Sequence, residues 1–354
     1  MTRSIGDGSL ALRMRVAGLM RVIAVPMMLA LTPAQAADQA LIDAAKKEGA
    51  VTWYTTLIVN QMARPAVDAF EKKYGIAVNY IRNDSQDIML RVLNEAKSGK
   101  VLADIYDGVS GVGTYKRENL LEKWLPDVAK TLPKEFFDKD GYWIGTSLYL
   151  QAFSYNTDLV KKGDEPKTLQ DLLDPKWKGQ MAISGSSSTT GVGGFVGHVV
   201  TKMGEEKGVE YLKKLALQKP AVLQVSTRQV MDQVIAGEYQ IGVQTLTHHA
   251  AFSSSRGAPV EWVPTEDAMG SLLILGLFKG PHPNAGKLLI DFLMSDEGQT
   301  LFREADYIPV APNVQARQAR LKPDGVNFRA RIFTPEEIDA GQPGWMKIFQ
   351  ETLK

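Results

Sequence analysis

Cysteine is absent from all 354 residues, and histidine occurs only four times. Without cysteine the chain can form neither disulfides nor thiolate metal sites, and it cannot carry a lipid on an N-terminal cysteine. No two of the histidines stand at the i, i+4 spacing that ligates a metal from one helix. The phosphate-binding loop, a complete dinucleotide fingerprint and the nucleophile elbow of hydrolases are missing as well. No nucleophile–base pair can be named, so we expect a protein that is not an enzyme and uses no cofactor.

Apolar runs of transmembrane length are also lacking, and the longest early run lies in a targeting segment. Four arginines precede an apolar stretch over 22–31, which is too short to cross a bilayer. Ala34 and Ala36 then supply the small residues of a cleavage site before Ala37. Residues 1–36 are therefore predicted to be a secretory signal peptide. Because no N-terminal cysteine could be lipidated, the exported protein is expected in the periplasm.

A marked excess of either charge is likewise missing. Removal of the signal peptide takes away four Arg and one Asp and leaves 37 basic and 39 acidic residues, a net charge of −2. This balance gives no basis for binding nucleic acid or an anionic membrane surface. The hydrophobic fraction of 44% can bury a large core, and the length suggests two lobes.

Strand and helix patterns alternate along the mature chain. We expect helices over 38–48, 64–74, 87–98, 205–217, 227–236 and 284–294 and after Gly191, and strands over 51–54, 76–81, 103–107, 180–183, 222–225, 239–243 and 272–277. This alternation predicts an α/β fold with mixed, mostly parallel sheets. The extended segment 148–156 is expected near the crossing between the lobes, and the polar segment 315–354 has no clear pattern. The predicted lobes are 37–147 plus 265–320 and 148–264 plus 321–354.

A run of hydroxyl residues stands between an apolar strand and a predicted helix. It comprises Ser186, Ser187, Ser188, Thr189 and Thr190. A helix N-terminus has unpaired N–H groups and partial positive charge, so hydroxyls beside it can bind an anion without a charged side chain. The alternative is a cluster that only caps its own helix. The run exceeds what one cap requires, which favours the anion site.

Ligands of open α/β sheets bind beyond the carboxyl ends of the strands. That rule selects Tyr54, Thr55, Thr56, Asn83, Asp84, Ser85, the segment 107–110 with Ser110, Thr227, Arg228, Thr245, His248 and His249. Such groups bind a carboxylate, phosphate or phosphonate through neutral donors, with Arg228 as a charged clamp. Each also has an ordinary explanation: Thr227 and Asp84 are suited to capping helices, and Arg228 to a solvated first turn. Of Asp104 and Asp107, one is expected to stabilise a turn or face the ligand.

Three phrases of the chain resemble a known family. They are Tyr155–Val160, Leu169–Gln180 and His282–Gln299. Together they are similar to the extracellular solute-binding proteins of ABC importers, in the group that includes ferric-iron, phosphonate and sugar-phosphate binders. The resemblance implies a type II periplasmic binding protein with two lobes that close on a solute. It also implies delivery of that solute to a cognate ABC permease in the inner membrane.

The ferric branch of that family typically carries two adjacent tyrosines after the strand placed here at 239–243. This chain has Gln244–Ala250 there, with His248 and His249 but no tyrosine. Phenolates suit Fe³⁺ as hard anionic donors, whereas imidazoles are softer and neutral. The pair is therefore interpreted as contacting an anion or as structural, with iron ligation as the alternative.

These observations together predict a monomeric binding protein for a small organic or phosphorylated anion. Ser186–Thr190 would hold the acidic group, with Thr55 or Thr56 from the other lobe and Arg228. Closure of the lobes would bury the solute. The rival hypotheses are a ferric-iron carrier that uses His248 and His249, and an exported hydrolase.

Overall fold

The computed structural model describes residues 33–186, 190–265, 268–323 and 329–354. The predicted signal peptide lies outside this part except for residues 33–36, which begin the first helix. Within the described ranges, no helix combines the length and the apolar character needed to span a bilayer.

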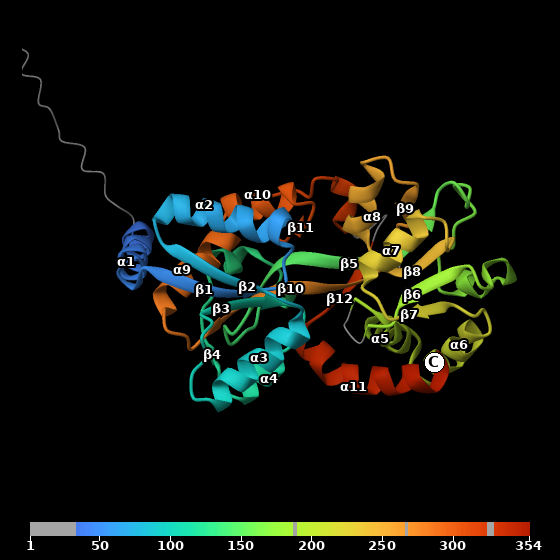
Figure 1. Ribbon diagram of the computed structural model, residues 1–354, viewed down its shortest axis with the longest axis horizontal. Coiled ribbons are helices and arrows are strands. Elements are labelled where there is room, and N and C mark those ends of the chain that lie inside the picture. The colour runs from blue at the N-terminus through green and yellow to red at the C-terminus, as the bar shows by residue number, and fades with distance from the viewer. Residues whose placement is uncertain (1–32, 187–189, 266–267, 324–328) are drawn as a thin grey trace, which may run out of the picture.

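The first part of the chain alternates strands with helices, as the sequence predicts. Its elements are α1 (Pro33–Glu48), β1 (Ala50–Thr55), α2 (Arg64–Tyr74), β2 (Ala77–Arg82), α3 (Ser85–Lys97), β3 (Ile105–Gly108), α4 (Val112–Arg117) and β4 (Leu121–Glu122). Gly75 ends α2 in the left-handed region at φ 71°, which a residue with a Cβ rarely adopts. In Figure 1 these elements form the left half of the molecule, which we call the first lobe.

A long strand then carries the chain into a second half. The elements there are β5 (Ile144–Asn156), β6 (Met181–Ser184), α5 (Val192–Met203), α6 (Glu205–Ala216), β7 (Ala221–Leu223), α7 (Thr227–Ile235), β8 (Ile241–Leu246), α8 (Thr247–Ser254) and β9 (Val260–Trp262). We call the half built on β6, β7 and β8 the second lobe; it occupies the right of Figure 1. The predicted lobe boundary between residues 147 and 148 falls inside β5.

A second long strand leads back before the chain ends on a helix between the halves. The last elements are β10 (Ala268–Phe278), α9 (Pro283–Met294), α10 (Asp296–Glu304), β11 (Ile308–Pro309), β12 (Ala330–Phe333) and α11 (Pro335–Thr352). In Figure 1, α9 and α10 lie in the first lobe, and α11 begins near the middle of the molecule and runs below the second lobe. The segment 315–354, which lacked a clear pattern, thus contains a strand and a long helix.

One continuous mixed sheet joins the two lobes, in the order β2-β1-β3-β10-β5-β8-β6-β7. Strand pairs within each lobe are parallel, as in β1 with β2 and β6 with β7. The pairs at the centre are antiparallel because β5 and β10 run in opposite directions between the lobes. The predicted α/β fold with crossing strands is confirmed.

Two large apolar clusters form the core, the first centred in the first lobe but extending into α7, α8 and β9, and the second within the second lobe. The first core packs large side chains such as Trp53, Phe70 and Phe292. The second gathers Trp177, Phe195 and Phe349, the last of which comes from α11. Burial at about 25 cal/mol per Å² of apolar surface makes these two cores the main source of stability.

Candidate functional site

A cavity of about 360 Å³ lies where the two lobes face each other. Its lining residues are Thr56, Asp84, Ser85, Gln86, Asp87, Val109, Ser110, Tyr149, Ser186, Thr190, Ser226 and Thr227. The residues up to Ser110 belong to the first lobe, Tyr149 lies on the crossing strand β5, and the rest belong to the second lobe. We call this cavity the interlobe cleft; its volume suits a small molecule.

A larger hollow of about 550 Å³ lies elsewhere, along the segment from Gly163 to Trp177. All of its lining comes from this one stretch of the second lobe. It therefore has no opposing wall that could close, whereas the interlobe cleft has walls from both lobes.

Three helices begin at the interlobe cleft. Asp84 is the N-cap residue of α3, Ser226 caps α7, and Thr190 directly precedes the N-cap residue of α5. The Ser226 hydroxyl accepts a hydrogen bond from the Gln229 amide, which leaves the two earlier amides of α7 without a partner inside the helix. Each of these N-termini contributes partial positive charge at the cavity; at α3 the carboxylates of Asp84 and Asp87 oppose it, whereas the α5 and α7 ends have no acidic residue in their first turn.

The loop before α5 brings two of its hydroxyl residues to the cleft. Ser186 and Thr190 both line it, at either end of the predicted hydroxyl run. A Cβ on Gly191 would lie 2.3 Å from the Ser186 carbonyl oxygen, so glycine is required for these two residues to approach so closely. Ser187, Ser188 and Thr189, predicted to join them, lie outside the described residues.

A buried carboxylate fixes the opposite wall. Both the amide and the hydroxyl of Thr56 donate hydrogen bonds to Oδ1 of Asp107, at 2.8 and 2.6 Å. The second oxygen of Asp107 is buried and has no hydrogen-bond partner among the described residues. Burial raises the pKa of Asp107 from 3.8 to about 6, against the opposing effect of its hydrogen bonds. Of the two acidic residues considered in the sequence, Asp107 lies in β3 and holds a wall of the cleft in place. Asp104 instead accepts hydrogen bonds from the amides of Thr52 and His282.

Sequence reasoning did not select Tyr149, which lies on the floor of the cleft. Its ring is stacked on Tyr307 with centroids 6.1 Å apart, and burial raises the pKa of its phenol well above 10. The phenol therefore remains protonated and can donate a hydrogen bond. The sequence did indicate that Tyr149 lies in an extended segment that crosses between the lobes. It did not show which side chains of that segment face the cleft.

The cleft also carries two carboxylates, from Asp84 and Asp87 at the start of α3. Asp84 is paired with Arg82 at 3.3 Å. Among the described residues that line the cleft there is no lysine or arginine. The first-lobe wall is thus acidic, whereas the second-lobe wall presents hydroxyls and helix amides.

Three predicted residues of the first lobe lie away from the cleft lining. The Tyr54 hydroxyl donates to Glu95 at 2.6 Å and accepts from Arg91 at 3.0 Å. Thr55 is fully buried, and its hydroxyl accepts from the Leu57 amide. Asn83 is exposed, with its side chain bonded to the next amide. The prediction that ligands bind beyond the carboxyl ends of the strands, which we call the strand-end rule, does not separate the two faces of a strand. Because successive side chains of a strand point to opposite faces, the rule also selects residues that point away from the cleft.

Arg228, predicted as a charged clamp, is bonded elsewhere. Its guanidinium donates to Ser253 at 3.0 Å and to Asp232 at 2.7 Å, and it is not part of the cleft lining. Thr227 beside it faces the cleft and is almost fully buried. Successive side chains on a helix point about 100° apart, so Thr227 can face the cleft while Arg228 points away from it.

The end of β8 was expected to be a loop at the site but continues into α8. Thr245 is buried inside the strand. His248 packs against Tyr149 and Tyr307, with ring centroids 5.6 and 5.4 Å away, and burial lowers its pKa to about 4. His249 adjoins His248 at 4.5 Å. Neither histidine lines the cleft, and His248 packs behind Tyr149, which does.

The part of the chain that the structure describes contains no group of three His, Asp or Glu side chains able to hold a metal ion. The polar groups that face the cleft are mainly hydroxyls. The arrangement can therefore bind a small polar molecule. It brings together eight residues that the sequence analysis selected: Thr56, Asp84, Ser85, Val109, Ser110, Ser186, Thr190 and Thr227.

Known proteins with similar sequences or folds include periplasmic binding proteins. The chain is 26% identical over 289 residues to the putative 2-aminoethylphosphonate-binding periplasmic protein of Salmonella typhimurium, covering 78% of this chain and 80% of that one. Its fold is similar to that of AfuA from Actinobacillus pleuropneumoniae with bound fructose 6-phosphate, at a TM-score of 0.72 and 23% identity, covering 86% of this chain and 98% of that one. It is equally similar, at 0.72 and 19% identity, to iron-bound HitA from Pseudomonas aeruginosa, covering 86% and 99%.

The predicted fold of a type II periplasmic binding protein is thereby confirmed. The family of bacterial extracellular solute-binding proteins matches residues 103–329, which is more than half of the chain. The match includes the crossing strands β5 and β10 and most of the second-lobe wall of the cleft. This protein belongs to the family of bacterial extracellular solute-binding proteins, whose members serve ABC transporters.

Proposed function

We propose that this chain captures a small solute with an acidic group, such as a phosphate, phosphonate or carboxylate, in the interlobe cleft and delivers it to an ABC permease. The observation that carries the proposal is that the N-termini of α5 and α7 meet a hydroxyl-rich lining on the second-lobe wall of the cleft. Backbone amides at helix N-termini bind anions, and hydroxyls supply further donors.

The two walls of the cleft give the solute an orientation. Its acidic group would lie on the second-lobe wall, against Ser186, Thr190 and Thr227. Its other end would face the carboxylates of Asp84 and Asp87, which accept hydrogen bonds from an amine or from hydroxyls. The relatives support this polarity, because 2-aminoethylphosphonate carries an amine and fructose 6-phosphate carries hydroxyls.

Iron binding through His248 and His249 is less well supported. The His248 ring packs against Tyr149, His249 adjoins His248, and burial lowers the pKa of His248. An anionic solute fits the hydroxyl lining of the cleft better than Fe³⁺ does, and the binding test below includes Fe³⁺ as the rival ligand.

The proposal includes the periplasm as the place of action and a single chain as the binding unit. The signal-like pattern of residues 1–36 and the periplasmic relatives support export. Both walls of the cleft come from one chain, so a monomer can close on the solute without a partner copy. Closure would present the loaded form to the permease.

The experiment is a thermal-shift screen of carboxylates, phosphates, phosphonates and Fe³⁺, preceded by native mass spectrometry of gently purified protein. A solute at one hundred times its Kd stabilises the fold by about 2.7 kcal/mol. We expect 2-aminoethylphosphonate, fructose 6-phosphate or a related acid to raise the melting temperature. A shift with Fe³⁺ alone, or none across the panel, would contradict the proposal.

Two variants locate the binding. Replacing both Thr190 and Thr227 by Val keeps their shape but removes two hydroxyls, and should weaken binding at least about tenfold. Arg228→Ala is the matched control: it alters the residue next to Thr227 on the same helix, but its side chain is bonded to Asp232 and Ser253. Equal losses of affinity in the Thr190→Val/Thr227→Val protein and in Arg228→Ala would indicate that the solute binds outside the interlobe cleft.

A further inference from the structure

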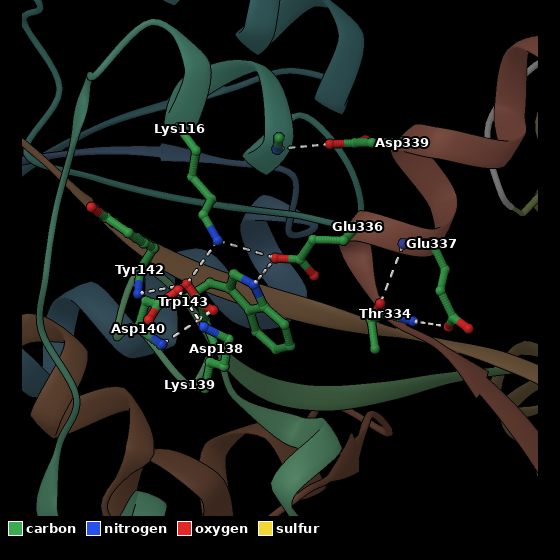
Figure 2. A network of polar contacts seen from close by, with 11 residues as sticks. Lys116, Asp138, Lys139, Asp140, Tyr142, Trp143, Thr334, Glu336, Glu337 and Asp339 are labelled. Atoms are coloured by element: carbon green, nitrogen blue, oxygen red, sulfur yellow. Dashed lines mark hydrogen bonds and ion pairs between the residues drawn. The ribbon is translucent and has the colours of Figure 1, made fainter.

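The last helix of the chain joins the two lobes through different parts of its length. The N-terminal turns of α11 bond to the first lobe, where Glu336 accepts hydrogen bonds from Trp143 at 2.8 Å and from Lys116 at 3.5 Å. Figure 2 shows these contacts together with that of Asp339. The helix itself starts from Thr334, whose hydroxyl and backbone form a capping box with Glu337.

The C-terminal turns of α11 belong to the second lobe. Ile348 and Phe349 are part of its apolar core, and α11 packs along α5. A Cβ on Gly197 of α5 would lie 2.7 Å from the Trp345 ring, so glycine lets the two helices approach closely. The helix is therefore anchored firmly in the lobe opposite to the one that its first turns contact.

Asp339 supplies the cap that α4 lacks. The N-cap residue of α4 is Gly111, at φ 98°, and it has no side chain to accept hydrogen bonds. Instead the Gly111 amide donates to Oδ1 of Asp339 at 3.3 Å, and the Gly113 amide donates to Oδ2 at 2.7 Å. A carboxylate that accepts two amides at a helix N-terminus is stabilised by charge and dipole together.

The turn held in this way adjoins the solute cleft. Ser110, directly before Gly111, lines the interlobe cleft. A neighbouring cavity of about 230 Å³ shares Ser110 and Gln86 with the cleft and is lined on its other side by Asp339 and Met346 of α11. Asp339 thus lies behind the wall that Ser110 presents to the solute, and it is not itself part of the cleft lining.

We propose that Asp339 is a positioning residue for the cleft: by holding the Gly111 and Gly113 amides, it fixes the Ser110 wall to a helix anchored in the opposite lobe. The inference rests on the proposed function of the cleft. Its consequence is that solute affinity depends on a side chain that the solute does not contact.

Two variants disrupt the contact between the Asp339 carboxylate and the Gly111 and Gly113 amides, one by changing the carboxylate and the other by changing the turn that it holds. Asp339→Asn keeps one acceptor oxygen but turns an amide group toward the second N–H. Gly113→Ala adds a Cβ 2.7 Å from Oδ2 of Asp339, and alanine favours the helical backbone, so the carboxylate is displaced without penalty to α4 itself. Glu336→Gln is the matched control, because it loosens the same helix from the same lobe without touching the Ser110 turn.

The test measures amide hydrogen exchange in the ligand-free full chain and the Kd for 2-aminoethylphosphonate and fructose 6-phosphate by calorimetry. Asp339→Asn and Gly113→Ala should speed exchange at residues 110–114 by about tenfold or more. Both should also weaken probe binding about fivefold or more, while Glu336→Gln lowers the melting temperature and leaves the Kd unchanged.

Unchanged exchange at Gly111 and Gly113 in Asp339→Asn would overturn the inference. Faster exchange with an unchanged Kd would overturn it too, because Asp339 would then be merely structural. If neither probe binds the wild-type protein, the proposed function loses its support, and the exchange measurement alone decides whether Asp339 holds the turn.

Discussion

Replacing Asp107 by asparagine should change how the stability of the protein depends on pH. The Asp107 side chain is 1% exposed, and burial raises its pKa from 3.8 to about 6. Between these values the folded carboxyl keeps its proton while the unfolded one releases it. The folded state thus binds more protons, and the free energy of unfolding falls as pH rises through this interval.

The magnitude follows from the interval. At about 1.4 kcal/mol per pH unit, the span from 3.8 to about 6 amounts to about 3 kcal/mol of stability that the wild-type protein lacks above pH 6. The substituted amide would keep an oxygen for the Thr56 amide and hydroxyl but would carry no charge to desolvate. The variant should therefore gain stability relative to wild type as pH rises.

The assay is urea unfolding of both proteins at pH 4 and at pH 7.5. Because the unfolded carboxyl is already partly ionised at pH 4, the difference between their free energies of unfolding should shift by about 2 kcal/mol in favour of Asp107→Asn at the higher pH. All other titrating groups are common to the two proteins and cancel. A difference that stays constant between the two pH values would refute the assignment of a raised pKa to this buried carboxyl.

His248→Phe should have the opposite effect on pH dependence. The pKa of His248 is lowered by burial from 6.5 to about 4, so the wild type loses up to about 3 kcal/mol on acidification through that interval and the variant does not; equal acid sensitivity in urea unfolding would contradict this. Gly197→Ala should destabilise the second lobe by about 1–3 kcal/mol despite the better helix propensity of alanine, because its Cβ would lie 2.7 Å from the Trp345 ring. A raised melting temperature in calorimetry would show that the ring moves aside freely.

The elements with strong periodicity were predictable from the sequence. The helix predicted over 64–74 is α2 to the residue, since its apolar spacing is regular and Gly75 ends it. The helix α11 was not predicted, because Gly341, Pro343 and Gly344 interrupt a polar stretch. Its stability comes from packing against α5 and a capping box, and tertiary contacts of this kind leave little trace in local sequence.

The cleft was predictable in outline and not in detail. The strand-end rule selected Thr56 and Thr227, which line it, together with Thr55 and Arg228, which do not. The rule identifies which end of a strand bears the site but not which way each side chain turns. The rule could not select Tyr149, because β5 passes between the lobes and contributes a residue from its middle to the cleft lining, not from its end.

The central claim is that the second-lobe wall of the cleft holds the acidic group of the solute. The most direct measurement is a crystal structure of the protein with whichever phosphorylated or phosphonylated compound raises its melting temperature most. The phosphorus-bound oxygens are predicted within hydrogen-bond distance of Ser186, Thr190 and Thr227, with the rest of the molecule toward Asp84 and Asp87. A compound bound outside the interlobe cleft, or with its acidic group turned to those two carboxylates, would contradict the account.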